Sequence, residues 1–122
     1  MGTGSHAWSA PEKFLTDRRL PSDIVILSDG SLLVVHGYRT IPRGVRAARS
    51  RDGGRTWLPF DLVIHDKAAI NTDTGYPSVE LRNGWLIVSF YDASNTPGAH
   101  RDYKGAYLEV VRFKESDLLA IP

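Results

Sequence analysis

Short apolar runs separated by turn residues make up most of the chain, and helical periodicity is almost absent. Four runs in the first half are expected to contain strands: 24–27, 32–38, 45–50 and 57–64. Three further runs follow after a long interval: 76–81, 85–91 and 104–113. Only the segment 115–119 is expected to form a helical turn. The pattern predicts an all-β fold of short antiparallel strands.

Two parts of the chain share a sequence pattern. Gly30 and Gly84 each follow an acidic or amide residue and precede a dense apolar run, and they are 54 residues apart. The segments 20–22 and 76–78 also resemble each other. A repeat of this size is typical of one four-stranded sheet unit with a long loop. We expect an N-terminal extension or tag-like segment at 1–19, one unit at 20–66, and a second at 67–122 with a C-terminal tail.

The composition is that of one globular domain, with 122 residues of which 42% are hydrophobic and 24% charged. No apolar run approaches 18 residues, so no membrane partner is expected. Residues 1–6 lack the apolar stretch of a signal peptide, and the compartment stays open. The chain has no cysteine and its four histidines are scattered. We therefore expect no disulfide, no metal and no cofactor.

Arginine dominates the basic residues, although the net charge is only +1. Six arginines fall between Arg39 and Arg55. The planar guanidinium suits bidentate contacts with carboxylate or phosphate groups. An acidic sugar, a nucleic acid or a plain solvated surface would each account for the cluster. Nucleic acid is not expected, because acidic residues balance the arginines and no nucleic-acid-binding motif is present.

The segment 50–57 carries the most specific motif, and it reads Ser-Arg-Asp-Gly-Gly-Arg-Thr-Trp. It fits the pattern Ser-x-Asp-x-Gly-x-Thr-Trp, the Asp-box. Gly54 can adopt a positive φ, and Ser50 and Asp52 can accept hydrogen bonds from backbone N–H groups across the turn. Thr56 is expected to start the next strand, and Trp57 to bury its ring under the hairpin. The motif resembles the repeat of sialidase-type β-propellers, the bacterial neuraminidase repeat family.

The resemblance extends over about 20–91. It includes the stretch 38–47 before the motif and the stretch 73–78 after it, which are similar to the C-terminal part of sialidase-like proteins. The resemblance implies two four-stranded antiparallel blades of a six-bladed propeller, partial in a single chain. Two blades would leave wide apolar flanks exposed. We therefore expect either missing blades from a longer chain or a homo-oligomer, in which three copies would supply six blades.

Blade geometry separates the Asp-box, which is expected to be structural, from the ligand face. The ligand-face segments are expected at 20–23, 39–46, 71–76 and 92–102. In sialidases an arginine triad holds the sugar carboxylate and a tyrosine is the nucleophile, with a carboxylate nearby. The resemblance assigns Tyr76 as the nucleophile and Arg46 as a triad arginine. Further candidates on these segments are Asp73 near the tyrosine, and Arg39, Arg43 and Asp92 as groups that bind an acidic glycan.

Other catalytic groups of the family belong to blades upstream of this region. The expected function is therefore a carbohydrate-directed propeller segment, an exo-sialidase-like glycoside hydrolase only within a complete propeller. The alternatives are a non-catalytic assembly or binding module and a gene fragment without an enzymatic role. Each of the two main site residues also has a structural interpretation. Tyr76 would equally be an aromatic residue that packs around the propeller axis, and Arg46 would equally form a structural ion pair with Asp73 or Asp92. His36 is expected to be buried and hydrogen-bonded.

Overall fold

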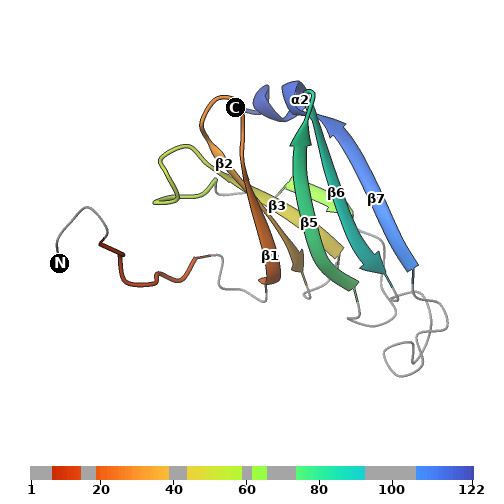
Figure 1. Cartoon of the computed structure of the whole chain (residues 1–122), viewed down its shortest axis with the longest axis horizontal. Coiled ribbons are helices and arrows are strands. Elements are labelled where there is room, and N and C mark those ends of the chain that lie inside the picture. Colours follow the sequence, from red (N-terminus) through yellow and green to blue (C-terminus); the bar gives the residue numbers. More distant parts are fainter. Residues whose placement is uncertain (1–6, 15–18, 39–43, 59–61, 66–73, 93–106) are drawn as a thin grey trace.

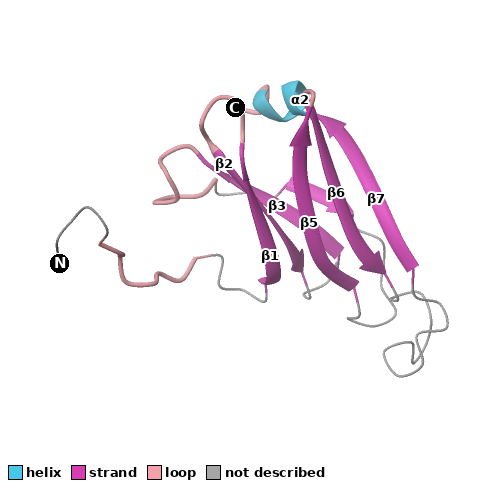
Figure 2. Ribbon diagram, viewed as in Figure 1, coloured by secondary structure: helices cyan, strands magenta, loops and turns pink. Residues whose placement is uncertain are grey.

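A computed structural model gives the arrangement of residues 7–14, 19–38, 44–58, 62–65, 74–92 and 107–122. These residues form two antiparallel sheets and one short helix (Figures 1 and 2). The first sheet has the order β1-β2-β3-β4, with strands β1 (Arg19–Ile26), β2 (Leu32–Tyr38), β3 (Gly44–Ser50) and β4 (Leu62–His65). The second has the order β5-β6-β7, with strands β5 (Thr74–Arg82), β6 (Trp85–Asp92) and β7 (Tyr107–Lys114). Helix α2 (Glu115–Leu119) follows β7 directly.

Tight turns set the register of the β1–β2 hairpin and of the β5–β6 hairpin. Between β1 and β2, Leu27 N donates to Ser31 O (2.8 Å) and Gly30 N donates to Leu27 O (2.9 Å). Between β5 and β6, Asn83 and Gly84 both have positive φ, 51° and 79°. Two consecutive positive φ values are typical of the type I′ turn, for which Asn-Gly is the preferred sequence.

The two sheets pack face to face around one apolar core. The first sheet contributes Leu33, Val35, Val45 and Ala47, and the second contributes Val79, Leu86, Val88 and Phe90. Leu118 of α2 closes the core at one end. Along each strand these residues alternate with residues on the opposite, outward face, as the two-residue period of a β-strand requires.

Strands β1 and β5 lie beside each other where the sheets meet (Figure 1). The Asp23 carboxylate of β1 accepts hydrogen bonds from Val79 N of β5 (3.0 Å) and from the Ser78 hydroxyl (3.4 Å). At the other end of β5, a Cβ on Gly75 would lie 3.4 Å from the Cα of Gly37, so glycine permits this close approach.

The all-β prediction is confirmed, as are the helical turn at 115–119 and the predicted strands where the structure describes them, apart from shifts at their ends. Residues 59–61 and 104–106 of the predicted strands lie outside the described residues. The start of the fourth strand is wrong, since residues 56–58 lie outside any strand. Thr56 instead turns its N–H and hydroxyl toward Asp52. The second sheet has three strands in the described residues, not four, because after β7 the chain enters α2 and Glu115 N bonds to Gly84 O.

Among the described residues, no helix is long and apolar enough to cross a membrane. The assignment of the two sheets to propeller blades stays a prediction.

Candidate functional site

One end of the two sheets carries the residues expected to face a ligand. Strand pairing places Tyr38 opposite Gly44 in the first sheet, and Asp92 between Thr74 and Tyr107 in the second. The Asp-box turn after β3 and the helix α2 lie at the other end, as the antiparallel order requires (Figure 1). Three of the expected site residues, Arg39, Arg43 and Asp73, lie outside the described residues.

Arg46 lies in β3 directly opposite His36 of β2. It alternates with the core residues Val45 and Ala47, so its side chain projects from the outward face of the first sheet. Its guanidinium carbon is 4.1 Å from the centre of the Tyr38 ring. This cation–π contact holds a half-buried positive charge near the end of the sheet.

Tyr76 lies at a local irregularity of β5. The pairing of β5 with β6 shifts between Gly75 and Ser78. Pro77 has no N–H for the ladder, which accounts for the irregularity at this point. Tyr76 has a φ of 48°, an unusual value for an aromatic residue, and it is 58% exposed. Its ring lies 5.6 Å from the ring of Tyr91 on β6, centre to centre.

The structure does not gather the expected site residues into one pocket. Tyr76 and Tyr91 lie on the outward face of the second sheet, whereas Arg46 lies on the outward face of the first. Asp92 is 1% exposed and alternates with Tyr91, so its side chain is on the interior side with Phe90. Within the described residues, the chain therefore offers two separate pairs, Tyr76 with Tyr91 and Arg46 with Tyr38.

The Asp-box forms the hydrogen-bonded turn expected from its sequence. The Asp52 carboxylate accepts hydrogen bonds from Thr56 N (2.8 Å), from the Thr56 hydroxyl and from Arg55 N (3.1 Å). Ser50 Oγ donates to Asp52 (2.8 Å) and accepts from Gly54 N (2.9 Å). The hydrogen bonds from Thr56 are the main cause that lowers the pKa of Asp52 from 3.8 to about 2.

Both glycines of the Asp-box have positive φ, 77° at Gly53 and 93° at Gly54. Trp57 is half-buried and stacks on Phe14, with ring centres 4.8 Å apart and an interplanar angle of 12°. In the described residues its indole nitrogen is buried without a hydrogen-bond partner. The sequence interpretation missed the role of Phe14 because it assigned residues 1–19 to an extension.

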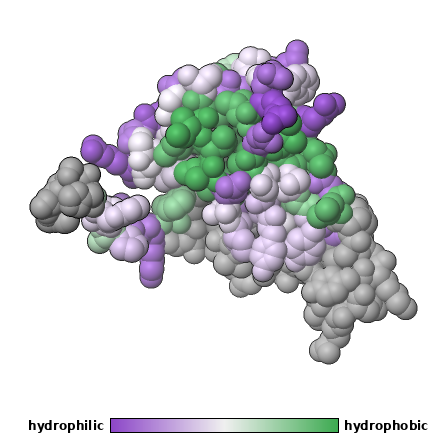
Figure 3. Space-filling model, in the orientation of Figure 1, coloured by the Kyte–Doolittle hydropathy of each residue, from purple (hydrophilic) through white to green (hydrophobic). Residues whose placement is uncertain are grey.

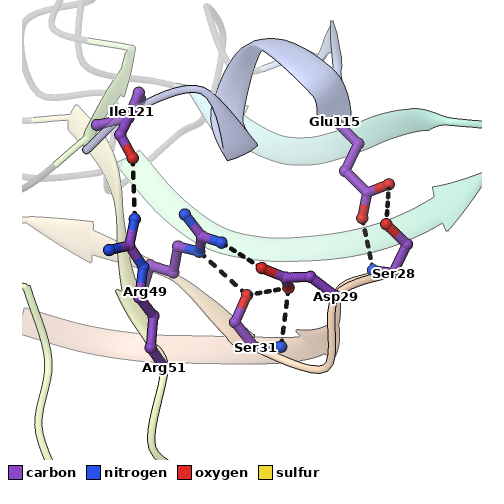
Figure 4. Close-up of polar contacts among 7 residues, drawn as sticks. All are labelled: Ser28, Asp29, Ser31, Arg49, Arg51, Glu115 and Ile121. Carbon is purple, nitrogen blue, oxygen red and sulfur yellow. Dashed lines mark hydrogen bonds and ion pairs between the residues drawn. The ribbon is translucent and has the colours of Figure 1, made fainter.

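A polar junction, not expected from the sequence, joins the two sheets at the Asp-box end (Figure 4). The Glu115 carboxylate accepts hydrogen bonds from Ser28 N (2.7 Å) and from the Ser28 hydroxyl (2.8 Å). Arg49 donates to Asp29 (2.5 Å) and to the Ser31 hydroxyl (3.0 Å). The pKa of Asp29 is lowered, mainly by its hydrogen bonds from Ser31.

The arginine cluster therefore divides into different roles. Arg49 is 4% exposed and ion-paired with Asp29, so it is structural. Arg51 donates to Ile121 O near the C-terminus (2.9 Å; Figure 4). Of the described arginines, Arg46 lies near the end where the ligand-face segments leave the sheets, as does Arg19 of β1, which pairs with Tyr38. The burial of Arg49 had one signal in the sequence: Arg49 lies at alternate positions of β3 with Val45 and Ala47, and therefore on the same, inward face.

The expectation for His36 has a clear outcome. His36 is buried, and its Nδ1 lies 2.9 Å from Gly37 O, as expected of a hydrogen-bonded buried histidine. In the second sheet, Phe90 packs in the core and Trp85 lies on the outward face. The described residues contain no group of three or more potential metal ligands.

Comparison with models of known protein families, with curated proteins and with solved structures found no match to this chain.

Proposed function

We propose that this chain is a carbohydrate-directed segment of a sialidase-like β-propeller, incomplete for glycoside hydrolysis on its own. The Asp-box sequence and its hydrogen-bonded turn support this proposal. The strand order β1-β2-β3-β4 and the neighbouring positions of β1 and β5 are also consistent with successive blades that pack face to face.

The observation that carries the carbohydrate proposal is the conformation and exposure of Tyr76. A non-glycine residue with positive φ costs free energy, and such residues cluster at binding and catalytic sites. Here the strain presents an aromatic side chain beside Tyr91, at the end of the sheet opposite the Asp-box. The exposed ring of Tyr76 beside the half-buried ring of Tyr91 offers an apolar surface for the C–H face of a sugar ring. Arg46, over Tyr38, supplies a separate cation at the same end, on the outward face of the first sheet, where an acidic group can bind.

The proposal that catalysis is incomplete follows from the separation of these groups. Glycoside hydrolysis needs a nucleophile or base and an acid on opposite sides of one scissile bond. Tyr76 and Arg46 lie on different outward faces, and the nearby Asp92 is buried on the interior side. A further chain or further copies would have to supply the remaining groups.

A hydrolysis assay with a fluorogenic sialoside tests whether catalysis is incomplete, and a binding assay with sialyllactose tests the carbohydrate site. We expect no turnover above the uncatalysed rate, and weak binding that falls at least about fivefold in Tyr76→Ala, which corresponds to about 1 kcal/mol for the loss of the apolar contact with the ring. Trp8→Ala, which removes another exposed aromatic ring, is the control and should leave binding unchanged. Turnover that disappears in Tyr76→Phe would refute incomplete catalysis; binding that Tyr76→Ala does not change would refute the site.

A second candidate function, an assembly module, is favoured by the exposed apolar residues of both sheets. Ile24, Ile26 and Val63 are exposed in the first sheet, and Leu108 and Val110 in the second. Figure 3 shows apolar side chains gathered over the strands in the middle of the face it displays. Large exposed apolar areas mark association surfaces. Sedimentation should then show a discrete oligomer, three copies for a six-bladed ring; a monomer at all concentrations would exclude this candidate.

A further inference from the structure

The two sheets differ at their outer edges. The first sheet continues beyond β3 to β4, whereas β7 is the last strand of the second sheet in the described part of the chain. The outer edge of β7 therefore presents backbone N–H and C=O groups that can pair with another strand. This edge lies on the side of the molecule away from the contact between β1 and β5 (Figure 1).

An apolar cavity opens beside the same edge. Its lining is mostly apolar and includes Ile64 of β4, Val111 and Phe113 of β7, and Leu118 and Ile121 at the C-terminal end, together with one acidic residue, Asp117 of α2. The cavity volume is about 290 Å³. An engineered apolar cavity of about 150 Å³ in another protein binds benzene, so this volume accepts one or two aliphatic side chains. The inward-facing side chains of a strand added to β7 would enter it.

The outward face of β7 is basic near the same edge. Arg112 and Lys114 alternate with Val111 and Phe113, so they face away from the cavity. Their charged groups lie 5.6 and 5.7 Å from the ring centre of Trp85. The outward-facing side chains of an added strand would lie beside these two cations, where carboxylates are favoured.

A second copy of β7 does not fit this edge. In a continuous sheet, opposed residues of neighbouring strands face the same side. The outward-facing residues of β7 that the structure describes are Leu108, Val110, Arg112 and Lys114, none of them acidic. In an antiparallel pair of β7 strands whose outward faces lie on the same side, the cations would lie opposite an aliphatic side chain or another cation. Such cations deter pairing between identical edges.

We propose that the outer edge of β7 and the adjacent cavity bind an extended segment of a partner protein by strand addition. The segment carries aliphatic residues at alternate positions, directed into the cavity, and acidic residues between them, directed toward Arg112 and Lys114. Backbone hydrogen bonds to β7 supply affinity, and the cavity and the cations supply specificity. This inference does not depend on the proposed carbohydrate site.

The test uses capped synthetic heptapeptides that alternate valine with glutamate or valine with lysine. Binding to the full chain is measured by calorimetry at physiological ionic strength, and backbone amide exchange of β7 is followed by NMR. We expect the glutamate peptide to bind more tightly than the lysine peptide and to slow exchange of those β7 amides that do not bond to β6. No binding by the glutamate peptide, or equal binding of the two, would overturn the proposal.

Two N-methylated glutamate peptides distinguish strand addition from non-specific apolar binding. One carries methyl groups on the valine nitrogens, the other on the glutamate nitrogens. In a paired strand, alternate residues direct their N–H groups to the neighbour, so only one of the two peptides can still pair with β7. We expect one methylated peptide to bind and the other to fail. Equal binding of the two would exclude strand addition.

A matched pair of charge reversals tests the outward face. Arg112→Glu should weaken binding of the glutamate peptide about fivefold and should strengthen binding of the lysine peptide. Arg82→Glu makes the same change on β5, about 10 Å from the edge and beyond the screening length of about 8 Å. It should leave both affinities unchanged. Equal effects of the two reversals would overturn the proposed partner.

Discussion

Asp52 organises the Asp-box turn through hydrogen bonds that all lie within a few residues of sequence. Its carboxylate accepts from the side chain and backbone of Thr56 and from Arg55 N. Ser50 and Gly54 complete the turn. Because every partner is local, the sequence pattern predicted that Ser50 and Asp52 accept hydrogen bonds from backbone N–H groups. It did not predict the bonds of Asp52 with the Thr56 and Ser50 hydroxyls or the positive φ of Gly53.

The lowered pKa of Asp52 predicts a pH-dependent contribution to stability. The pKa falls from 3.8 to about 2 in the folded chain, so the contribution is present above the unfolded-state value and is lost as the pH falls through about 2. In Asp52→Asn, the urea midpoint should be lower at neutral pH, and its decrease between pH 5 and pH 2 should be shallower. Asp117→Asn in α2 controls for the loss of one negative charge. Parallel acid profiles of wild type and Asp52→Asn would contradict this role.

The sequence alone could not distinguish the buried arginine Arg49 from the outward-facing arginine Arg46. They are three residues apart in one strand, but Arg46 projects outward over Tyr38 and Arg49 is buried against Asp29 and Ser31. An arginine-rich segment indicates neither burial nor partner. Those follow from strand register and from the second sheet, which the local pattern does not contain.

The two arginines should differ in their contribution to the free energy of unfolding. Arg49→Ala removes two hydrogen bonds from a buried group and should cost about 2–3 kcal/mol. Arg46→Ala should cost less than about 1 kcal/mol, as is usual for a partly exposed cation. Urea denaturation at neutral pH measures both values. Equal losses would show that the burial of Arg49 does not matter for stability.

At the scale of elements, turns were easier to predict than the ends of strands. The pair Asn83 and Gly84 has the sequence preference of a type I′ turn, and the turn lies where it was expected. The fourth strand begins later than expected because Thr56 bonds back to Asp52. The helix at 115–119 was predicted, but its contact with the β1–β2 turn was not, because Ser28 and Glu115 are 87 residues apart.

The contact between Ser28 and Glu115 should couple α2 to the first sheet. Ser28→Ala should cost about 1 kcal/mol and Glu115→Gln about 1–2 kcal/mol, because each leaves a hydrogen-bonding group of the junction without its partner. The double variant should cost less than the sum by about 0.5 kcal/mol or more, since both changes remove the same interaction. Additive losses in urea denaturation would show that the two residues contribute independently.

At the scale of the whole molecule, the repeated pattern predicted two sheet units but not how they cover each other. The inward faces share one core, and the outward faces carry Tyr76 on one sheet and Arg46 on the other. Which face becomes the interior depends on contacts between distant strands. The resemblance to sialidase-like propellers placed both residues at one end, but side-chain direction required the assembled sheets.

The central claim, that the end opposite the Asp-box binds an acidic sugar, is tested most directly by an NMR titration of the chain with sialyllactose. The account predicts that backbone amide signals of Tyr76 and Tyr91 shift progressively, while those of Asp52 and its turn stay fixed. An absence of shifts at saturating sugar, or shifts confined to the Asp-box end, would contradict it.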